Sequence, residues 1–297
     1  MDRLLGPDCH NAAMRDRRRQ FTAVLALAAA LIAALTLTRG QRTLYSLTTV
    51  ADRTARVTGA HLAIQTTLSG LQSLSMTGSG TVNFRRGESA IAMQLDGLPS
   101  STQPPGGGPV EMFERETGGA VYVRSPLASS TLPGNARWIK VDVASLRGVL
   151  GVDPASTGES GIDPSSYLQY LQTHGARFSL AGTQAIRGVS TKHYVGSFDL
   201  LTELEPSLKA MPDQIRNAVS RTLTNADSVP IQVWVDGSGL IRREQISLEL
   251  DAGRPLTTTT TVELFDFGPT PRVVPPPADE TYDATGLVRS AFASDSV

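Results

Sequence analysis

The chain has 297 residues, of which 40% are hydrophobic, so it is long enough and apolar enough to fold around a sizeable core. Its 27 basic and 28 acidic residues nearly balance, which excludes the strongly basic face that nucleic-acid binding requires. The single cysteine, Cys9, precedes every element predicted for the folded domain, which excludes a disulfide, a thiolate metal site and a cysteine nucleophile there.

An apolar segment at residues 21–38 follows a basic flank at residues 15–20. As a helix it would rise about 27 Å, close to the hydrocarbon thickness of a membrane. The basic flank is expected to stay in the cytoplasm. We therefore predict a short cytoplasmic basic segment (1–20), a transmembrane signal anchor or signal peptide (21–38) and a linker (39–54).

Two questions about this segment stay open. No small-residue cleavage site follows it, since residues 38–41 read Thr-Arg-Gly-Gln, and this favours an uncleaved anchor over a cleaved signal peptide. With the anchor, the chain is a single-pass cell-membrane protein whose C-terminal domain is extracytoplasmic; after cleavage it is secreted. Arg18 and Arg19 before Phe21 match the core of a twin-arginine signal, but the interpretation that they only orient the helix is favoured.

From residue 44 onward, alternation of apolar and polar side chains predicts strands with one buried face. In the segment 74–84, Gly78 and Gly80 would allow strong bending or close approach of the backbone. Residues 236–239, Asp-Gly-Ser-Gly, predict a tight hairpin turn because glycine supplies positive φ. The predicted strands lie at 62–65, 74–84, 90–95, 110–115, 120–124, 177–182, 189–198, 231–235, 240–250 and 257–265.

Helical spacing interrupts this pattern at three places, residues 144–150, 164–173 and 200–223. The chain becomes proline-rich after residue 267, and residues 286–297 are expected to be a flexible tail. Because neither a repeat nor a long linker divides the sequence, we predict one domain at 55–285, built on one continuous sheet.

The sequence carries no recognisable catalytic motif. Its four histidines have no metal-ligand spacing, and the G-x-S-x-G nucleophile elbow is missing. The carboxylate pairs Glu114/Glu116 and Glu203/Glu205 alternate with polar neighbours, and we interpret them as solvated faces. We therefore predict that the protein is not an enzyme, has no catalytic residues and needs no cofactor or metal ion.

A strongly curved sheet would leave apolar space on its concave face that covering helices fill only in part. Such a surface suits acyl chains, whose burial is favourable by about 0.8 kcal/mol per CH₂. The alternative, that the same side chains simply fill a core, stays open. Strand parity nominates eleven lipid-binding residues: Leu62, Ile64, Met76, Val82, Phe84, Ile91, Met93, Phe178, Leu180, Ile231 and Val233.

Six stretches of the chain are considered together: 136–142 (ARWIKVD), 167–171 (YLQYL), 188–196 (GVSTKHYVG), 229–236 (VPIQVWVD), 239–243 (GLIRR) and 265–268 (FDFG). Taken in order, they resemble the mycobacterial LppX/LprG lipoprotein family over most of residues 55–285. None of them is a catalytic signature. The low lysine content, three of 27 basic residues, fits a high-GC, actinobacterial source.

The resemblance implies an α+β fold, a strongly curved antiparallel half-barrel like that of the LolA lipoprotein carrier, with helices covering its concave face. It implies binding or transfer of lipids or acylated glycolipids, with the cytoplasmic membrane and an envelope transport protein as candidate partners. In that family a lipidated cysteine follows the apolar segment, whereas the single cysteine of this chain, Cys9, precedes it. A lipid anchor is therefore not expected, and a transmembrane anchor is expected instead. The alternative function is an envelope sensor or interaction ectodomain that regulates a membrane partner.

Overall fold

The computed structural model describes residues 53–54, 56–70, 74–98, 110–126, 132–143, 177–200, 217, 222–251 and 255–293. The chain divides into two compact units, residues 1–37 and 38–297, and every described residue belongs to the second. The predicted anchor at 21–38 lies outside the described residues. Within the described ranges, no helix has both the length and the apolar character needed to span a membrane.

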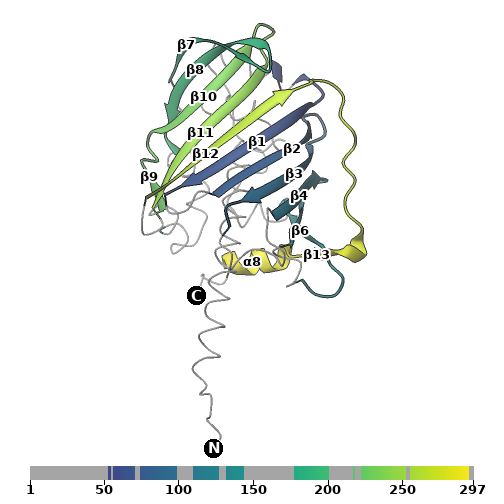
Figure 1. The fold of residues 1–297 in the computed structure, drawn as a ribbon. Helices are drawn as coiled ribbons and strands as arrows, with labels where there is room; N and C mark the ends of the chain where they lie inside the picture. Colours follow the sequence, from purple (N-terminus) through teal and green to yellow (C-terminus); the bar gives the residue numbers. More distant parts are fainter. Residues whose placement is uncertain are drawn as a thin grey trace, which may run out of the picture. The chain divides into compact units, whose positions relative to one another are not determined.

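Thirteen strands of the described part form one sheet (Figure 1). The first six are β1 (Ala60–Ser69), β2 (Leu74–Asn83), β3 (Glu88–Asp96), β4 (Val110–Thr117), β5 (Ala120–Arg124) and β6 (Trp138–Asp142). The others are β7 (Arg177–Ile186), β8 (Val189–Phe198), β9 (Leu223–Thr224), β10 (Val229–Asp236), β11 (Ile241–Asp251), β12 (Pro255–Phe265) and β13 (Thr281–Asp283). A 3₁₀ turn, η1 (Ala278–Glu280), precedes β13, and a helix, α8 (Thr285–Ala293), follows it.

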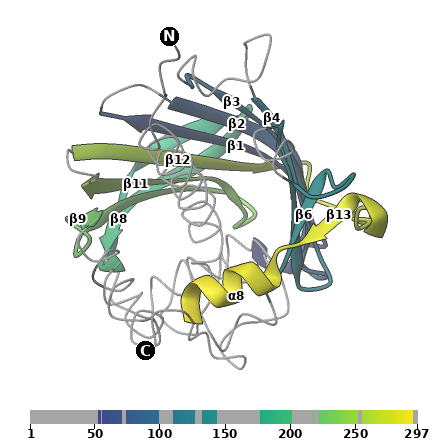
Figure 2. The same cartoon turned by 90° about the horizontal axis from the view of Figure 1, so that it is seen from below.

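The strands follow the order β13-β6-β5-β4-β3-β2-β1-β12-β11-β10-β8-β7, with β9 paired to β11. All neighbours are antiparallel except β13 and β6, which run parallel. Near the middle of the sheet, β1 pairs with both β2 and β12 and so joins the N-terminal strands to the C-terminal ones. Figure 2 shows that the sheet bends strongly across its width.

The predicted large antiparallel sheet is confirmed, and each predicted strand falls within an observed one or overlaps it. The predicted helices at 144–150 and 164–173 lie outside the described residues, as does almost all of 200–223. Strands β6, β9 and β13 and helix α8 were not predicted from the sequence. Residues 285–293 form a helix where a tail was expected from residue 286 onward; the mobility of that tail stays a prediction.

Glycines in β2 allow the close strand packing that the sequence predicted. A Cβ on Gly80 would lie 2.0 Å from the carbonyl oxygen of Ala90 in β3, far inside any tolerable contact. A Cβ on Gly78 would lie 3.0 Å from Cγ of Met93, a flexible side chain that occupies the space above this glycine. Gly80 therefore permits a backbone approach that no other residue allows.

The predicted hairpin turn between β10 and β11 is confirmed. Gly239 has a φ of 79°, and the Asp236 carboxylate accepts hydrogen bonds from the backbone N–H groups of Ser238 (2.8 Å) and Leu240 (3.0 Å). Nε of Arg242 lies 2.6 Å from the other oxygen of the same carboxylate. The aspartate thus holds the turn closed through both backbone and side-chain partners.

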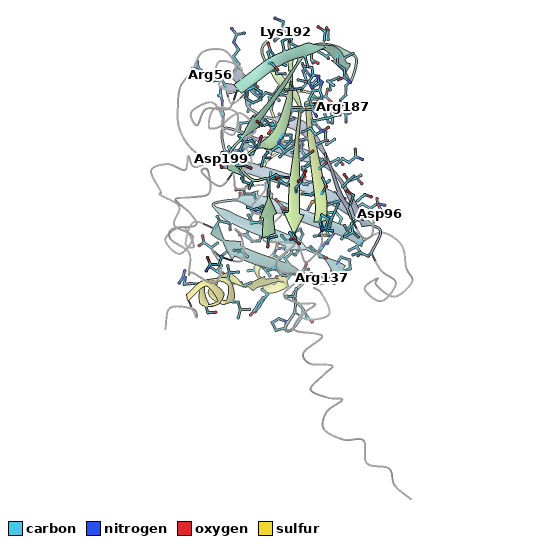
Figure 3. All side chains as sticks on the ribbon, turned by 90° about the vertical axis from the view of Figure 1, so that its left-hand side faces the viewer. Arg56, Asp96, Arg137, Arg187, Lys192 and Asp199 are labelled. Atoms are coloured by element: carbon cyan, nitrogen blue, oxygen red, sulfur yellow. The ribbon has the colours of Figure 1, made fainter. Side chains whose placement is uncertain are left out.

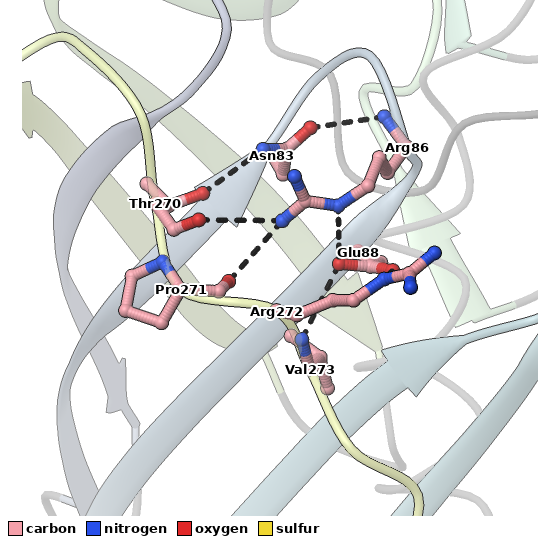
Figure 4. A network of polar contacts seen from close by, with 7 residues as sticks. All are labelled: Asn83, Arg86, Glu88, Thr270, Pro271, Arg272 and Val273. Carbon is pink, nitrogen blue, oxygen red and sulfur yellow. Dashed lines mark hydrogen bonds and ion pairs between the residues drawn. The ribbon is translucent and has the colours of Figure 1, made fainter.

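The segment after β12 crosses back to the far end of the sheet (Figure 1) and is fixed to the turn between β2 and β3 (Figure 4). There the buried carboxylate of Glu88 accepts hydrogen bonds from Nε of Arg86 (2.7 Å) and from the backbone N–H of Val273 (3.3 Å). Asn83 donates to Oγ1 of Thr270 at 3.1 Å. This segment, residues 266–280, is called the C-terminal strap below.

At the end of the strap, β13 and α8 attach to the edge strand β6. Oγ1 of Thr285, the first residue of α8, accepts a hydrogen bond from the backbone N–H of Asp142 at 2.8 Å. Asp283 accepts from the backbone N–H of Thr285 and pairs with Lys140. Hydrogen bonds from Thr285, followed by the contact with Lys140, lower the pKa of Asp283 to about 2.

Candidate functional site

One face of the sheet carries mainly apolar side chains, and the other carries mainly polar ones. The alternation is clearest in β3, where Ile91, Met93 and Leu95 are buried while Ala92 and Gln94 are exposed. Because side chains of a strand point alternately to the two faces, the first three residues define the apolar face of the sheet.

The strand register carries this apolar face across the sheet. Residues directly opposite each other on paired strands point to the same face, so the register can be followed from strand to strand. One such row runs from β7 to β4 through Leu180, Tyr194, Val233, Glu244, Val262, Ile64, Gly78, Met93 and Met112. The next runs through Phe178, Gly196, Ile231, Ile246, Thr260, Thr66, Met76, Leu95 and Val110.

Ten of the eleven residues nominated from sequence therefore lie on one face, and Phe84 follows directly after β2. Nine of the eleven are buried. Phe178 is half-buried and Leu180 is 60% exposed, because both lie on β7, the strand at one end of the sheet. The residues selected by strand parity are far apart in the chain, and the sheet places them on the same face. Their contact with a lipid stays a prediction.

Three carboxylates interrupt the apolar face, and the sequence interpretation of one pair was wrong. Glu114 and Glu116 were interpreted as a solvated face, yet Glu114 is only 6% exposed and lies directly opposite Ile91. The signal was present in the sequence: Val110 and Met112 share the parity of Glu114. Glu244, also buried, lies between Val233 and Val262 in the first row.

Burial changes the acidity of Glu114. Desolvation, followed by the nearby Glu116 carboxylate, raises the pKa of Glu114 from 4.5 to about 7. A carboxyl with this pKa is substantially protonated near neutral pH and can then donate a hydrogen bond.

A hydroxyl accompanies these carboxylates on the same face. Ser89 lies directly opposite Glu116 in the β3–β4 register and is 1% exposed. Its Oγ is the one buried side-chain oxygen or nitrogen among the described residues that has no hydrogen-bond partner. We call Ser89, Glu114 and Glu116 the polar spot. It is the main feature of this face that the sequence reading missed.

The opposite face has a different character. Glu263 on β12 lies 2.7 Å from Nε of Arg187 and 2.5 Å from Nη2 of Arg243. Although burial alone would raise the pKa of Glu263, the hydrogen bonds from Arg243 and Arg187 lower it. Figure 3 labels Arg187, which lies in the turn between β7 and β8 and pairs with Glu263. This face is therefore solvated and internally paired.

Both tryptophans pack on this polar face. Trp234 stacks on His193 with ring centroids 4.3 Å apart, and its Nε1 donates to Gln184 at 2.8 Å. Trp138 lies beneath the guanidinium groups of Arg115 and Arg124, at 4.9 and 5.3 Å from the ring centroid. The two rings thus stabilise the sheet from the side opposite the apolar rows.

The described residues bring together no group of three or more side chains able to hold a metal ion. The class they define is a mostly β protein with one large antiparallel sheet, one face of which carries mainly apolar side chains. No family model matches the sequence. No curated protein matches it either.

Solved structures do show similarity. The lipoprotein LppX of Mycobacterium tuberculosis is similar with a TM-score of 0.43 and 15% identity, over 77% of this chain and 98% of that one. LprF from Mycobacterium bovis is similar with a TM-score of 0.39 and 14% identity, over 78% and 97% of the two chains. The resemblance predicted from the sequence is thus confirmed as structural similarity at low sequence identity.

Proposed function

We propose that this protein is a non-enzymatic lipid-binding protein of the cell envelope, which holds the acyl chains of a lipid or acylated glycolipid against the apolar face. The observation that carries the proposal is the unbroken register of the two apolar rows across nine strands. Such a continuous surface is larger than a single side-chain cluster needs, and it matches a long, flexible, apolar ligand.

The dimensions of the rows fit an acyl chain. Strands lie about 4.8 Å apart, so a row crossing nine strands extends over roughly 38 Å along the sheet. One leaflet of a bilayer has a hydrocarbon depth of about 15 Å, half of the usual total. A whole membrane-lipid chain therefore fits along a row, and each CH₂ that it buries contributes about 0.8 kcal/mol.

The remaining parts of the proposal concern the segments that the structure does not describe. We infer that the helices predicted at 144–150, 164–173 and 200–223 cover the concave face of a half-barrel and complete the lipid cavity. The apolar segment 21–38 serves as an uncleaved membrane anchor, with the sheet on the extracytoplasmic side. A fixed anchor favours local reception of a lipid over long-distance carriage.

The test compares two neighbouring positions that point to opposite faces. The full chain is purified in a detergent without acyl chains, and bound lipid is measured by native mass spectrometry and solvent extraction. Ile91→Trp adds bulk on the apolar face while staying apolar, and it should reduce lipid occupancy at least several-fold. Ala92→Trp adds the same bulk on the exposed face and should leave occupancy unchanged.

Two results would contradict the proposal. Equal occupancy in both variants would place the lipid elsewhere on the molecule. The wild-type chain could also contain no lipid and take up none when lipid is added. That result would mean that the protein's own side chains fill the space against the apolar face. Circular dichroism of each variant shows whether the sheet is retained.

A further inference from the structure

We propose that the polar spot binds an alcohol hydroxyl group of the ligand, so that the preferred ligand is an acyl lipid with a free, uncharged hydroxyl. This inference rests on the proposed lipid-binding function and specifies the chemistry of the same face. It stands on the position and burial of Ser89 and Glu114 and on the missing hydrogen-bond partner of the Ser89 hydroxyl.

The register places the two groups beside each other on the apolar face. Ser89 lies opposite Glu116, and Glu114 is the next residue of β4 on the same face, opposite Ile91. Directly opposed residues have Cβ atoms about 4.5–5.5 Å apart, and diagonal ones about 7–8 Å. Ser89 and Glu114 are diagonal neighbours, so a small polar group between them can reach both within hydrogen-bonding distance.

The buried Ser89 hydroxyl lacks the partner that burial normally demands. Oγ of Ser89 has no hydrogen-bond partner, and its residue is 1% exposed. A buried hydroxyl without a partner destabilises the fold. Such groups persist where a ligand supplies the missing partner, and the surrounding rows show that this ligand is otherwise apolar.

The chemistry selects an alcohol over charged alternatives. A hydroxyl can donate one hydrogen bond and accept others, which matches a serine hydroxyl and a carboxyl group in either protonation state. A phosphate would bring negative charge toward Glu114 and Glu116, whose mutual repulsion already favours the protonated form of Glu114. An ammonium group would lose its hydration in an apolar setting.

The test uses two ligands that differ only in the hydroxyl group: dioleoylglycerol and its 3-O-methyl ether. Each competes with a fluorescent fatty acid for the full chain in detergent micelles. The wild-type protein should prefer the alcohol about tenfold, the ratio expected for one or two net hydrogen bonds. Ser89→Ala and Glu114→Leu should bring this ratio close to one while binding of the ether is retained. Glu114→Gln, whose amide still donates and accepts, should keep a preference.

Ser79→Ala, on the exposed face of β2, is the matched control and should keep the wild-type ratio. Failure of the wild type to bind either ligand would overturn the proposed function together with this inference. Binding of both ligands without preference, or an unchanged preference in Ser89→Ala, would overturn the inference and leave the lipid-binding function standing. Ser89→Ala decides the matter if Glu114→Leu does not fold, because it removes only one oxygen atom.

Discussion

At Gly80 the backbone of β2 lies against β3, and a single methyl group would have to displace it. A Cβ there would meet the carbonyl oxygen of Ala90 at 2.0 Å, and backbone atoms cannot rotate away as a side chain can. The alternation of the sequence indicated that this glycine served bending or close approach. It could not distinguish the two, because the approach depends on the partner strand.

Gly80→Ala should therefore lower the free energy of unfolding by about 1–3 kcal/mol, the usual cost of overpacking. Gly78→Ala is the matched control on the same strand and face. Its nearest neighbour is the flexible Met93 side chain at 3.0 Å, so the loss should be smaller. Urea unfolding of the two variants measures the difference, and equal losses would show that the packing of β2 on β3 is looser than described.

Glu114 makes the stability of the fold depend on pH. Its pKa is raised from 4.5 to about 7 in the folded chain, so between these values the folded state keeps a proton that the unfolded state has released. Stability therefore falls as pH rises through this window, and the loss is complete above pH 7. A shift of this size corresponds to about 3 kcal/mol.

Glu114→Gln should remove most of this decline, because an amide stays neutral at every pH in the window. Asp227→Asn, at an exposed position, should leave it unchanged. The free energy of unfolding is measured in urea at pH 4.5, 6 and 8. A decline of the same size in the wild type and in Glu114→Gln would show that another group is responsible.

The positions of most strands could be predicted because the alternation of apolar and polar residues is a local pattern. The pairing of each strand with its neighbours could not be predicted, because it joins residues far apart in the sequence. The two-residue alternation of β3 reports which side chains are buried, and the glycines after Asp236 report a tight turn. The parallel pairing of β13 with β6 depends on the C-terminal strap crossing the sheet, which no local pattern encodes. In β4, the charged Glu114 interrupts the alternation of apolar and polar residues. Its burial is recognised only because it shares a face with Val110 and Met112 and pairs with Ile91 in β3.

The attachment of the strap depends on one buried carboxylate. Glu88 binds both Arg86 and the backbone N–H of Val273, and its removal would leave a buried donor without a partner. Glu88→Ala should lower stability by about 2–4 kcal/mol and accelerate hydrogen exchange at the Val273 amide. The two effects have the same cause, because the carboxylate closes the contact between the β2–β3 turn and the strap.

Arg272→Ala is the matched control for this contact. Its guanidinium lies 3.9 Å from the same carboxylate, but the side chain is 81% exposed, so its loss should change stability by less than about 1 kcal/mol. Hydrogen exchange followed by mass spectrometry compares the two variants. Unchanged protection of Val273 in Glu88→Ala would mean that the strap is held by its other contacts.

The two faces of the sheet differ in character. The apolar face carries the rows and the polar spot, and the opposite face carries paired charges and the stacked tryptophans. The sequence alone could identify the apolar residues by parity, but it could not show that they form continuous rows. That continuity arises from the register of nine strands, which sequence-distant hydrogen bonds determine.

Photolabelling of the full chain with a fatty acid that carries a diazirine near its methyl end tests this division most directly. After irradiation, peptide sequencing by mass spectrometry locates the label within β3, where the two faces alternate residue by residue. We expect label on Ile91, Met93 and Leu95, and we expect competing lipid to remove it. Label on Ala92 and Gln94, or labelling that excess lipid does not reduce, would contradict this expectation.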